Sequence, residues 1–437
     1  MTPRVSAVAV AFVANGLGGP SFLPRLPERQ AALGLSDGGL GLVLVGMALG
    51  ALVASPFAGR LVGRTGSRPV VVVAATMLGA SLWTAGAAPH PVVLFLALTF
   101  VGAADAAMDI AMNANGAAYE RRTRRSVMHR LHGAWSLGAL GAAGLAAAAA
   151  AAGVSLTWQL AAAGTVIVGG VLATRSGLVA DDREAAESST GPHAAGDPVH
   201  GDSASGATSV AAPPRVDAAV STPGTGIRSV GPRVRARVLG PLVILGAATV
   251  GGAVIEGAPA DWSAIRLERL GQGPGAAALG FAAFMAGMLA GRAVGDHATD
   301  RFGGATVLRS GMALVALGLL AGVLVDHPMM FGVGLVVAGL GASGFFPLAF
   351  SAAGNTPGVA PGAGAATVSL TARLGFLVEP LLMGGLAELI GLRWAFAAVA
   401  AVALALAAAA GRIIPPATGP AAAPPADNPP VTDLRAC

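Results

Sequence analysis

Residues 58–63 read Ala58-Gly59-Arg60-Leu61-Val62-Gly63, and residues 290–295 repeat the pattern as Ala290-Gly291-Arg292-Ala293-Val294-Gly295. The first copy follows the second apolar stretch of the chain, and the second copy follows the eighth. A repeat at equivalent places in two sets of six apolar stretches indicates a duplicated unit. We therefore expect two related halves.

The composition is that of a chain surrounded by lipid. Hydrophobic residues make up 54% of the 437 residues, charged residues 11%, and the mean hydropathy is +0.70. A bilayer core needs about 20 apolar residues per helix. Twelve stretches approach that length, at about 6 to 23, 38 to 58, 70 to 88, 91 to 118, 132 to 152, 156 to 174, 238 to 257, 275 to 294, 305 to 325, 329 to 352, 363 to 386 and 392 to 411. The prediction is an all-α membrane protein with twelve transmembrane helices in two pseudo-symmetric six-helix halves.

The halves are expected at 1–174 and 238–414. Between them, residues 175–237 are rich in Ser, Pro, Ala and Gly and have no apolar period. The tail at 415–437 has the same character. Such segments cannot bury enough apolar surface to fold. We expect a disordered cytoplasmic linker and a disordered cytoplasmic tail.

The charges predict the orientation. All 27 basic residues are Arg, and 21 of them fall in alternate gaps between the apolar stretches. This side is called the arginine-rich side. Only Arg25, Arg29, Arg266, Arg269 and Arg393 fall on the other, arginine-poor side, and Arg373 lies within a span. By the positive-inside rule, both termini and the linker are cytoplasmic. Arginines spread over short loops form no single basic face, so nucleic-acid binding is not expected.

The second repeat continues through Asp296, Asp300, Arg301 and Gly303. This loop resembles the cytoplasmic signature of the major facilitator superfamily, in which a Gly precedes Asp-Arg and a further Gly. The first repeat departs from that form, since Gly63 and Arg64 stand where the Asp is expected. Residues 105–113, 132–138 and 256–263 are similar to the fucose-permease-like branch of bacterial inner-membrane transporters. The resemblance implies a secondary transporter that works by alternating access in the bacterial inner membrane.

The fourth span carries the most informative polar residues. Asp105, Asp109 and Asn113 are spaced by four residues and share one helix face. Acids in a membrane span are costly and usually face a wet cavity or a partner. Two carboxylates one turn apart repel each other, which favours proton exchange by one of them. We expect a substrate-binding or proton-coupling role, with Asp109 the deeper candidate; the alternative is that Asp105 pairs structurally.

Three further charged residues are candidates for the same role: Glu256, Arg373 and Glu379. Glu256 lies near the outer end of the seventh span, with Asp261 and Trp262 just beyond it. We expect this group to gate the external mouth or to bind solute through ring stacking; the alternative for Trp262 is an interfacial anchor. Arg373 is a candidate partner for Asp109 or Glu256 across the cavity.

A second group is expected to control opening on the arginine-rich side. Its members are Arg60, Arg64, Arg68, His132, Asp296, Asp300 and Arg301. Acids and arginines on facing loops are predicted to form an ion-pair latch that opens as the halves rock.

The predicted function is proton-coupled uptake of a sugar or similar polar solute by a monomer. The partners are the small-molecule substrate, protons and the lipid bilayer. Proton-coupled efflux of lipophilic drugs is the alternative, because Ala, Gly, Met and Leu dominate the spans; a non-transporting sensor is a remote one. No enzyme activity, cofactor or metal site is expected: no nucleophile and base stand at a readable spacing, no Walker A motif occurs, and His193 and His200 are too sparse for a metal site.

Overall fold

The computed structural model describes residues 4–125, 127–180, 232–354, 356, 359 and 361–414. Within these ranges the secondary structure is entirely helical. Eleven helices are long and apolar enough to cross a bilayer, and a twelfth span is obtained when one bent pair is counted as a single crossing. The prediction of an all-α, twelve-span membrane protein is confirmed.

The N-terminal half contains α1 (Val5–Gly16), α2 (Gly18–Phe22), η1 (Leu23–Arg25), α3 (Leu26–Leu33), α4 (Asp37–Thr65), α5 (Ser67–Ala87), α6 (Pro91–Thr123), α7 (Met128–Ala151), α8 (Leu156–Thr174) and η2 (Arg175–Gly177). The first span is bent by 46° between Gly16 and Gly18. Gly18, Gly19 and Pro20 are consecutive at this bend, and both residue types weaken a continuous helix.

The C-terminal half contains α10 (Pro232–Arg269), α11 (Pro274–Phe302), α12 (Gly304–Val325), α13 (Pro328–Ala342), α14 (Phe345–Gly354), α15 (Pro361–Ile390) and α16 (Leu392–Ile413). Several helices of the chain start with proline, as at Pro91, Pro274 and Pro328, because the first helical residue needs no N–H donor. The predicted tenth span is divided between α13 and α14.

Small residues set the distance between helices. In the N-terminal half, a Cβ on Gly102 of α6 would collide with the Met47 carbonyl oxygen of α4. Backbones approach this closely only where side chains are missing, and the resulting contacts replace the hydrophobic driving force that lipid does not supply.

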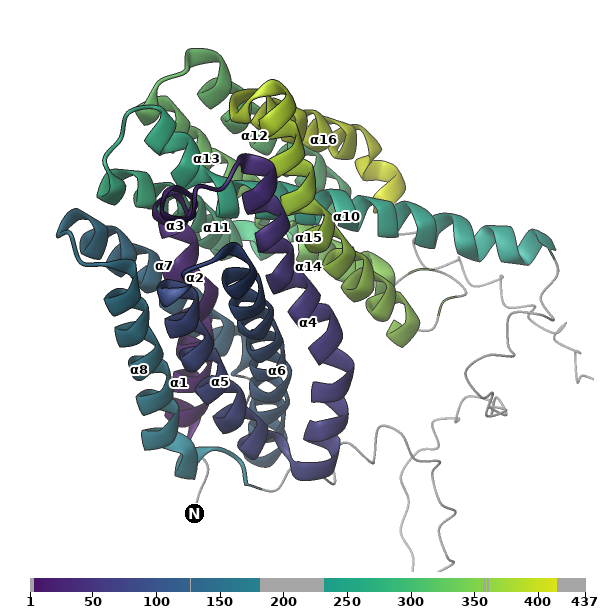
Figure 1. Ribbon diagram of the computed structural model, residues 1–437. Helices are drawn as coiled ribbons and strands as arrows, with labels where there is room; N and C mark the ends of the chain where they lie inside the picture. Colours follow the sequence, from purple (N-terminus) through teal and green to yellow (C-terminus); the bar gives the residue numbers. More distant parts are fainter. Residues whose placement is uncertain are drawn as a thin grey trace, which may run out of the picture.

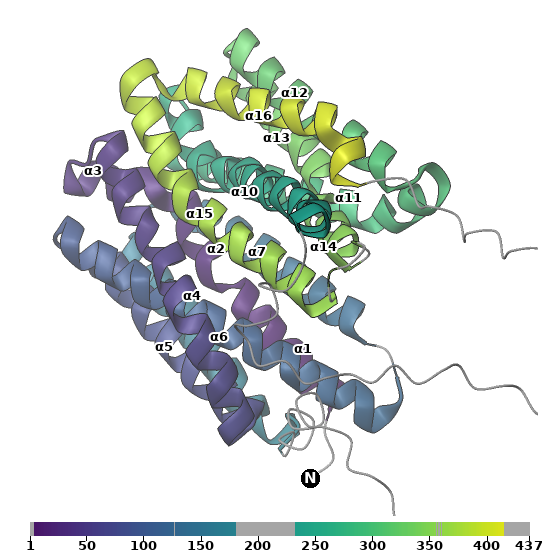
Figure 2. The same ribbon diagram turned by 90° about the vertical axis from the view of Figure 1, so that its right-hand side faces the viewer.

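The two halves meet on the arginine-poor side and diverge toward the other (Figure 1). Figure 2 shows the same divergence from a second direction, with the arginine-rich ends of α4 and α6 far from the arginine-rich ends of α10 and α16. On the closed side, a Cβ on Gly41 of α4 would collide with the Pro380 carbonyl of α15, and one on Gly275 of α11 would lie 2.6 Å from the Ala151 Cβ of α7. The molecule therefore opens on its arginine-rich side.

Three predicted boundaries differ. The seventh span does not end near residue 257 but continues as α10 to Arg269, since Pro259 and Asp261 are accommodated inside the helix. Residues 175–180, which we expected to open the disordered linker, pack on the N-terminal half: the Val179 N–H donates to the Asn115 side chain at 3.2 Å. At the other end, residues 232–237 belong to α10. The rest of the predicted linker, and the predicted tail, lie outside the described residues.

Candidate functional site

Asp105 is held by a residue of the first helix. The Asn15 amide donates to the Asp105 side-chain Oδ1 at 3.0 Å and to its carbonyl oxygen at 3.2 Å. The Trp135 indole Nε1–H of α7 donates to the Asn15 Oδ1 at 2.9 Å. Asn15 is buried, so this chain of hydrogen bonds fixes α6 against α1 and α7. Asp105 therefore has a clear structural role.

Asp109 lies one turn further along the same face of α6. Its partner is Asn113, whose amide donates to the Asp109 Oδ1 at 3.0 Å and to its carbonyl oxygen at 2.9 Å. Both side chains are half-buried. An amide from the same helix leaves the other carboxylate oxygen available to a solute or a proton.

Two basic side chains from other helices reach Asp109. His132, at the start of α7, and Arg373 of α15 are both close enough for coulombic interaction with its carboxylate. Arg373 also interacts with Asp105. Because Arg373 belongs to the C-terminal half and Asp109 to the N-terminal half, these charges converge where the halves face each other.

Arg373 does not form the predicted ion pair with Asp109 or Glu256 in this conformation. Its Nη1 instead donates to the Ala51 carbonyl of α4 at 3.2 Å. Glu256 interacts with Arg292 of α11, within its own half. Arg373 therefore interacts with Asp109 across the site by charge, without an ion pair between the two side chains.

Glu379 lies apart from Asp109. It is 1% exposed and packs against Gly257 of α10, while Asp261 and Trp262 are its interaction partners. Trp262 is fully buried, so the interpretation as an interfacial anchor is wrong; the helix continues past it and turns the indole into the bundle.

The predicted latch residues are not paired across the halves in this conformation. Among the described residues, Arg60 lies over the Phe57 ring at 5.9 Å and Arg301 over the Phe302 ring at 5.7 Å. Within the described ranges, no ion pair is formed by Arg64, Arg68, Asp296 or Asp300 either. The physical reason is distance, since these residues lie on the side where the halves diverge (Figure 1). His132, predicted to belong with them, lies beside Asp109 instead.

The ion pair that joins the halves lies on the opposite, arginine-poor side. Arg269 at the end of α10 pairs with Asp37 at the start of α4. The Gly38 N–H of α4 donates to the Glu388 Oε2 of α15 at 2.9 Å. Sequence reasoning missed Asp37 and Glu388, although Ser36-Asp37 carries a readable helix-start signal. We call Asp37, Gly38, Arg269 and Glu388 the Asp37 latch.

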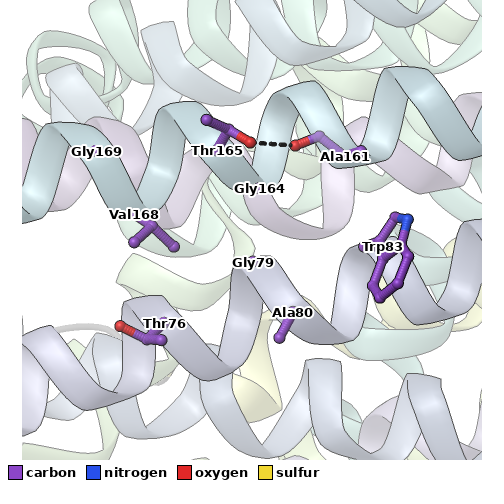
Figure 3. A pocket seen from close by; sticks show the side chains of 9 residues that line it. All are labelled: Thr76, Gly79, Ala80, Trp83, Ala161, Gly164, Thr165, Val168 and Gly169. Atoms are coloured by element: carbon purple, nitrogen blue, oxygen red, sulfur yellow. Dashed lines mark hydrogen bonds between the residues drawn. The ribbon is translucent and has the colours of Figure 1, made fainter.

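A groove of about 580 Å³ lies between α5 and α8 (Figure 3), and none of its lining residues is acidic. It is lined by Thr76, Gly79, Ala80, Trp83, Ala161, Gly164, Thr165, Val168 and Gly169. Both hydroxyl groups are satisfied within their own helices, Thr76 by the Val72 carbonyl and Thr165 by the Ala161 carbonyl, at 2.9 and 2.8 Å. The groove offers no unsatisfied hydroxyl to a polar solute. In the part of the chain that the structure describes, no cluster of His, Cys, Asp or Glu could hold a metal ion.

The sequence profile of the Major Facilitator Superfamily matches residues 8–258 and 262–435. An uncharacterized MFS-type transporter of Yersinia pestis is 29% identical over 402 residues, which cover 92% of this chain and 93% of the relative. An uncharacterized transporter of Sinorhizobium fredii is 30% identical over 390 residues, covering 89% of this chain and 92% of the relative.

Solved structures share the fold. The nucleoside transporter NupG superposes with a TM-score of 0.69 at 12% identity, covering 94% of this chain and 99% of NupG. A bacterial homolog of the human lysosomal transporter Spinster, in an inward-facing and unoccupied conformation, gives a TM-score of 0.68 at 14% identity, covering 94% and 96%.

Proposed function

Because this chain belongs to the Major Facilitator Superfamily, whose members are transporters and not enzymes, we propose that it takes up a small polar solute together with protons. Asp109 is the proposed proton-coupling acid. The observation that carries this proposal is the convergence of Asp109, His132 and Arg373 from three helices and both halves. A transporter of this kind exposes its central site alternately to the two sides of the membrane.

The charge pattern supports an orientation. With the arginine-rich side in the cytoplasm, the described conformation is open inward and closed by the Asp37 latch outward. The similarity to an inward-facing Spinster homolog supports the same assignment. We place the protein in a bacterial inner membrane, with both termini cytoplasmic. A single chain supplies both halves of the site, which supports a monomer as the working unit.

Each polar group has a proposed task. Arg373 would draw an anionic or hydrogen-bonding group of the solute, because guanidinium donates in a fixed fork. Asp109 would carry a proton when the solute is bound and release it toward the cytoplasm. His132 stands at the inward opening, where its imidazole would be the next proton acceptor. Asn113, which donates to the Asp109 carboxylate, would hold it in place.

The fold of the nucleoside transporter NupG adds nucleosides to the solutes worth testing. Nucleosides and sugars share hydroxyl groups that a carboxylate, an amide and a guanidinium can bind. The apolar composition of the spans keeps lipophilic cations as the second candidate, handled by proton-coupled efflux.

The test is proton movement in proteoliposomes that contain a pH-sensitive dye and receive nucleosides, sugars, amino acids or lipophilic cations in turn. We expect a solute-dependent proton flux that Asp109→Asn abolishes. Glu268→Gln serves as the control, because Glu268 is an exposed acid at the end of α10, outside the proposed site.

Three outcomes would contradict the proposal. A flux that persists in Asp109→Asn would remove Asp109 from coupling. A flux driven only by lipophilic cations would favour efflux. Solute uptake without proton flux would leave a transporter that uses no protons.

A further inference from the structure

A second pair of acids lies in the C-terminal half, outside the site described above. Asp261 of α10 and Glu379 of α15 interact through their carboxyl groups, and the Trp262 indole lies beside Glu379. Glu379 is 1% exposed and Trp262 is 0% exposed. The Glu379 Oε1 and the Trp262 Nε1 are both buried without a hydrogen-bond partner.

Among the residues that the structure describes, no basic side chain neutralises this pair. Every arginine on the arginine-poor side is bound elsewhere: Arg25 to Glu28, Arg29 to the carbonyls of Gly86 and Ala88, Arg266 and Arg393 to Asp326, and Arg269 to Asp37. Within the described ranges, neither carboxyl group has a basic side chain at ion-pair distance.

The other charged groups on the packed helices also act elsewhere. Arg292 of α11 acts on Glu256, Arg373 acts on Asp105 and Asp109, Glu388 binds the Gly38 amide, and Glu268 lies exposed at the end of α10. The remaining charged residues of α4, α11 and α16 lie at their arginine-rich ends. The half-buried Asp261 and the buried Glu379 therefore face each other without an opposing charge.

Two carboxylates in contact in a low-dielectric interior cannot both remain charged. We propose that Asp261 and Glu379 bind one exchangeable proton between them, as a proton site distinct from Asp109. The proton is taken from water and returned to it; when bound, one carboxylic acid O–H donates to the other carboxylate. The indole N–H of Trp262, which has no hydrogen-bond partner in the described conformation, is available as a further donor to the shared negative charge.

The site is placed to sense closure of the outer side. Asp261 precedes Arg269 of the Asp37 latch by eight residues, about 12 Å along the helix. Pro380, the residue after Glu379, contacts Gly41 of α4 across the two halves. Binding or release of the proton thus changes the charge of the Asp261–Glu379 pair next to the contact of Pro380 with Gly41, which joins the two halves. This consequence for transport rests on the proposed function, but proton binding itself does not.

Infrared spectroscopy of the full chain in lipid nanodiscs tests the proposal without any solute. We expect a carboxylic-acid C=O band that disappears as pH is raised. The band should be lost in Glu379→Gln, which removes the buried member of the pair. Glu268→Gln, an exposed acid on α10, should retain it. Asp261→Asn provides the second variant if Glu379→Gln does not fold, and it should lose the same band.

Two results would overturn the inference. A band unchanged in Glu379→Gln or Asp261→Asn would place the titrating proton elsewhere. A band that vanishes on adding Na⁺ at constant pH would assign the pair to a metal cation. The infrared measurement contains no solute, so it tests proton binding independently of transport. If the band behaves as expected but the proteoliposomes show no proton-coupled transport, only the proposed function is refuted.

Discussion

Breaking the Asp37 latch should shift the protein toward its outward-open state. The perturbation is the double variant Arg269→Gln and Glu388→Gln, which removes the ion pair to Asp37 and the carboxylate that caps Gly38. The side chains of Arg269 and Asp37 are 39% and 10% exposed, so solvent screens the pair and it contributes about 1 kcal/mol. A carboxylate on a helix N-terminal amide contributes about 1 kcal/mol more.

The sum of about 2 kcal/mol corresponds to roughly a 30-fold change in the ratio of the two states. If the outward-open state holds about 1% of the wild-type protein, it should rise to roughly a quarter in the variant. Most of the variant should remain in the described conformation, so the expected change is graded.

The assay is the distance between spin labels, measured by double electron–electron resonance on Ala32→Cys and Leu389→Cys. Both positions are exposed and lie on opposite halves near the latch. Cys437, the only native cysteine, is replaced by serine in every sample. The variant should gain a population with a longer distance. Glu268→Gln, next to Arg269 in the sequence, should give the wild-type distribution.

An unchanged distribution in the double variant would refute the reasoning, because it would show that the remaining contacts between the halves are sufficient to close this side. High salt offers a second check. It should raise the long-distance population of the wild type toward that of the variant, since screening weakens the exposed pair.

Three further predictions concern packing, the Asn15 hydrogen bonds and the linker. Gly102→Val should lower the thermal midpoint in detergent by an amount corresponding to about 1–3 kcal/mol, because its side chain would meet the α4 backbone; Gly59→Val, with open space around it, is the control. Asn15→Ala should cost about 2 kcal/mol or more in the same measurement, since it leaves the Asp105 carboxyl and the Trp135 indole unsatisfied. Replacing residues 181–231 by a Gly/Ser segment of equal length should leave transport intact.

Each of these three predictions has an outcome that would contradict it. Equal midpoints for the two glycine variants would mean that the close approach on α6 is not limiting. A neutral Asn15→Ala would mean that water replaces the lost amide. Loss of transport with the replaced segment, at unchanged expression, would favour the sensor hypothesis.

The twelve-span fold was predictable because hydropathy and arginine position are local properties of the chain. The repeat at Arg60 and Arg292 indicated the two halves for the same reason. The partners of the site residues were not predictable. Nothing in the spacing of Asp105 indicates that Asn15 and Trp135 hold it, because these contacts depend on how α1, α6 and α7 pack.

If the protein works by the proposed alternating access, the side on which the ion pairs form depends on its conformation. Sequence reasoning placed the latch among Arg60, Asp296 and Arg301, whereas the described conformation joins the halves through Asp37 and Arg269. Under the proposed alternating access, the charged residues on both sides would be used, but those of only one side would be engaged at a time. The end of α10 was missed for another reason: Pro259 and Asp261 are typical of helix ends, yet here they lie inside the helix.

The bond from the Gly38 amide to Glu388 has a consequence for the backbone of α4. The first amides of a helix have no partner within it, and here one of them is satisfied by a residue more than 300 positions away, in the other half. When the halves separate, that amide returns to water while the Gly39 amide keeps its bond to Ser36. Deuterium should therefore enter at Gly38 at the rate of outward opening and leave Gly39 protected. The exchange rate at Gly38 would then report the opening rate, and the exchange rate at the neighbouring Gly39 would be its internal reference.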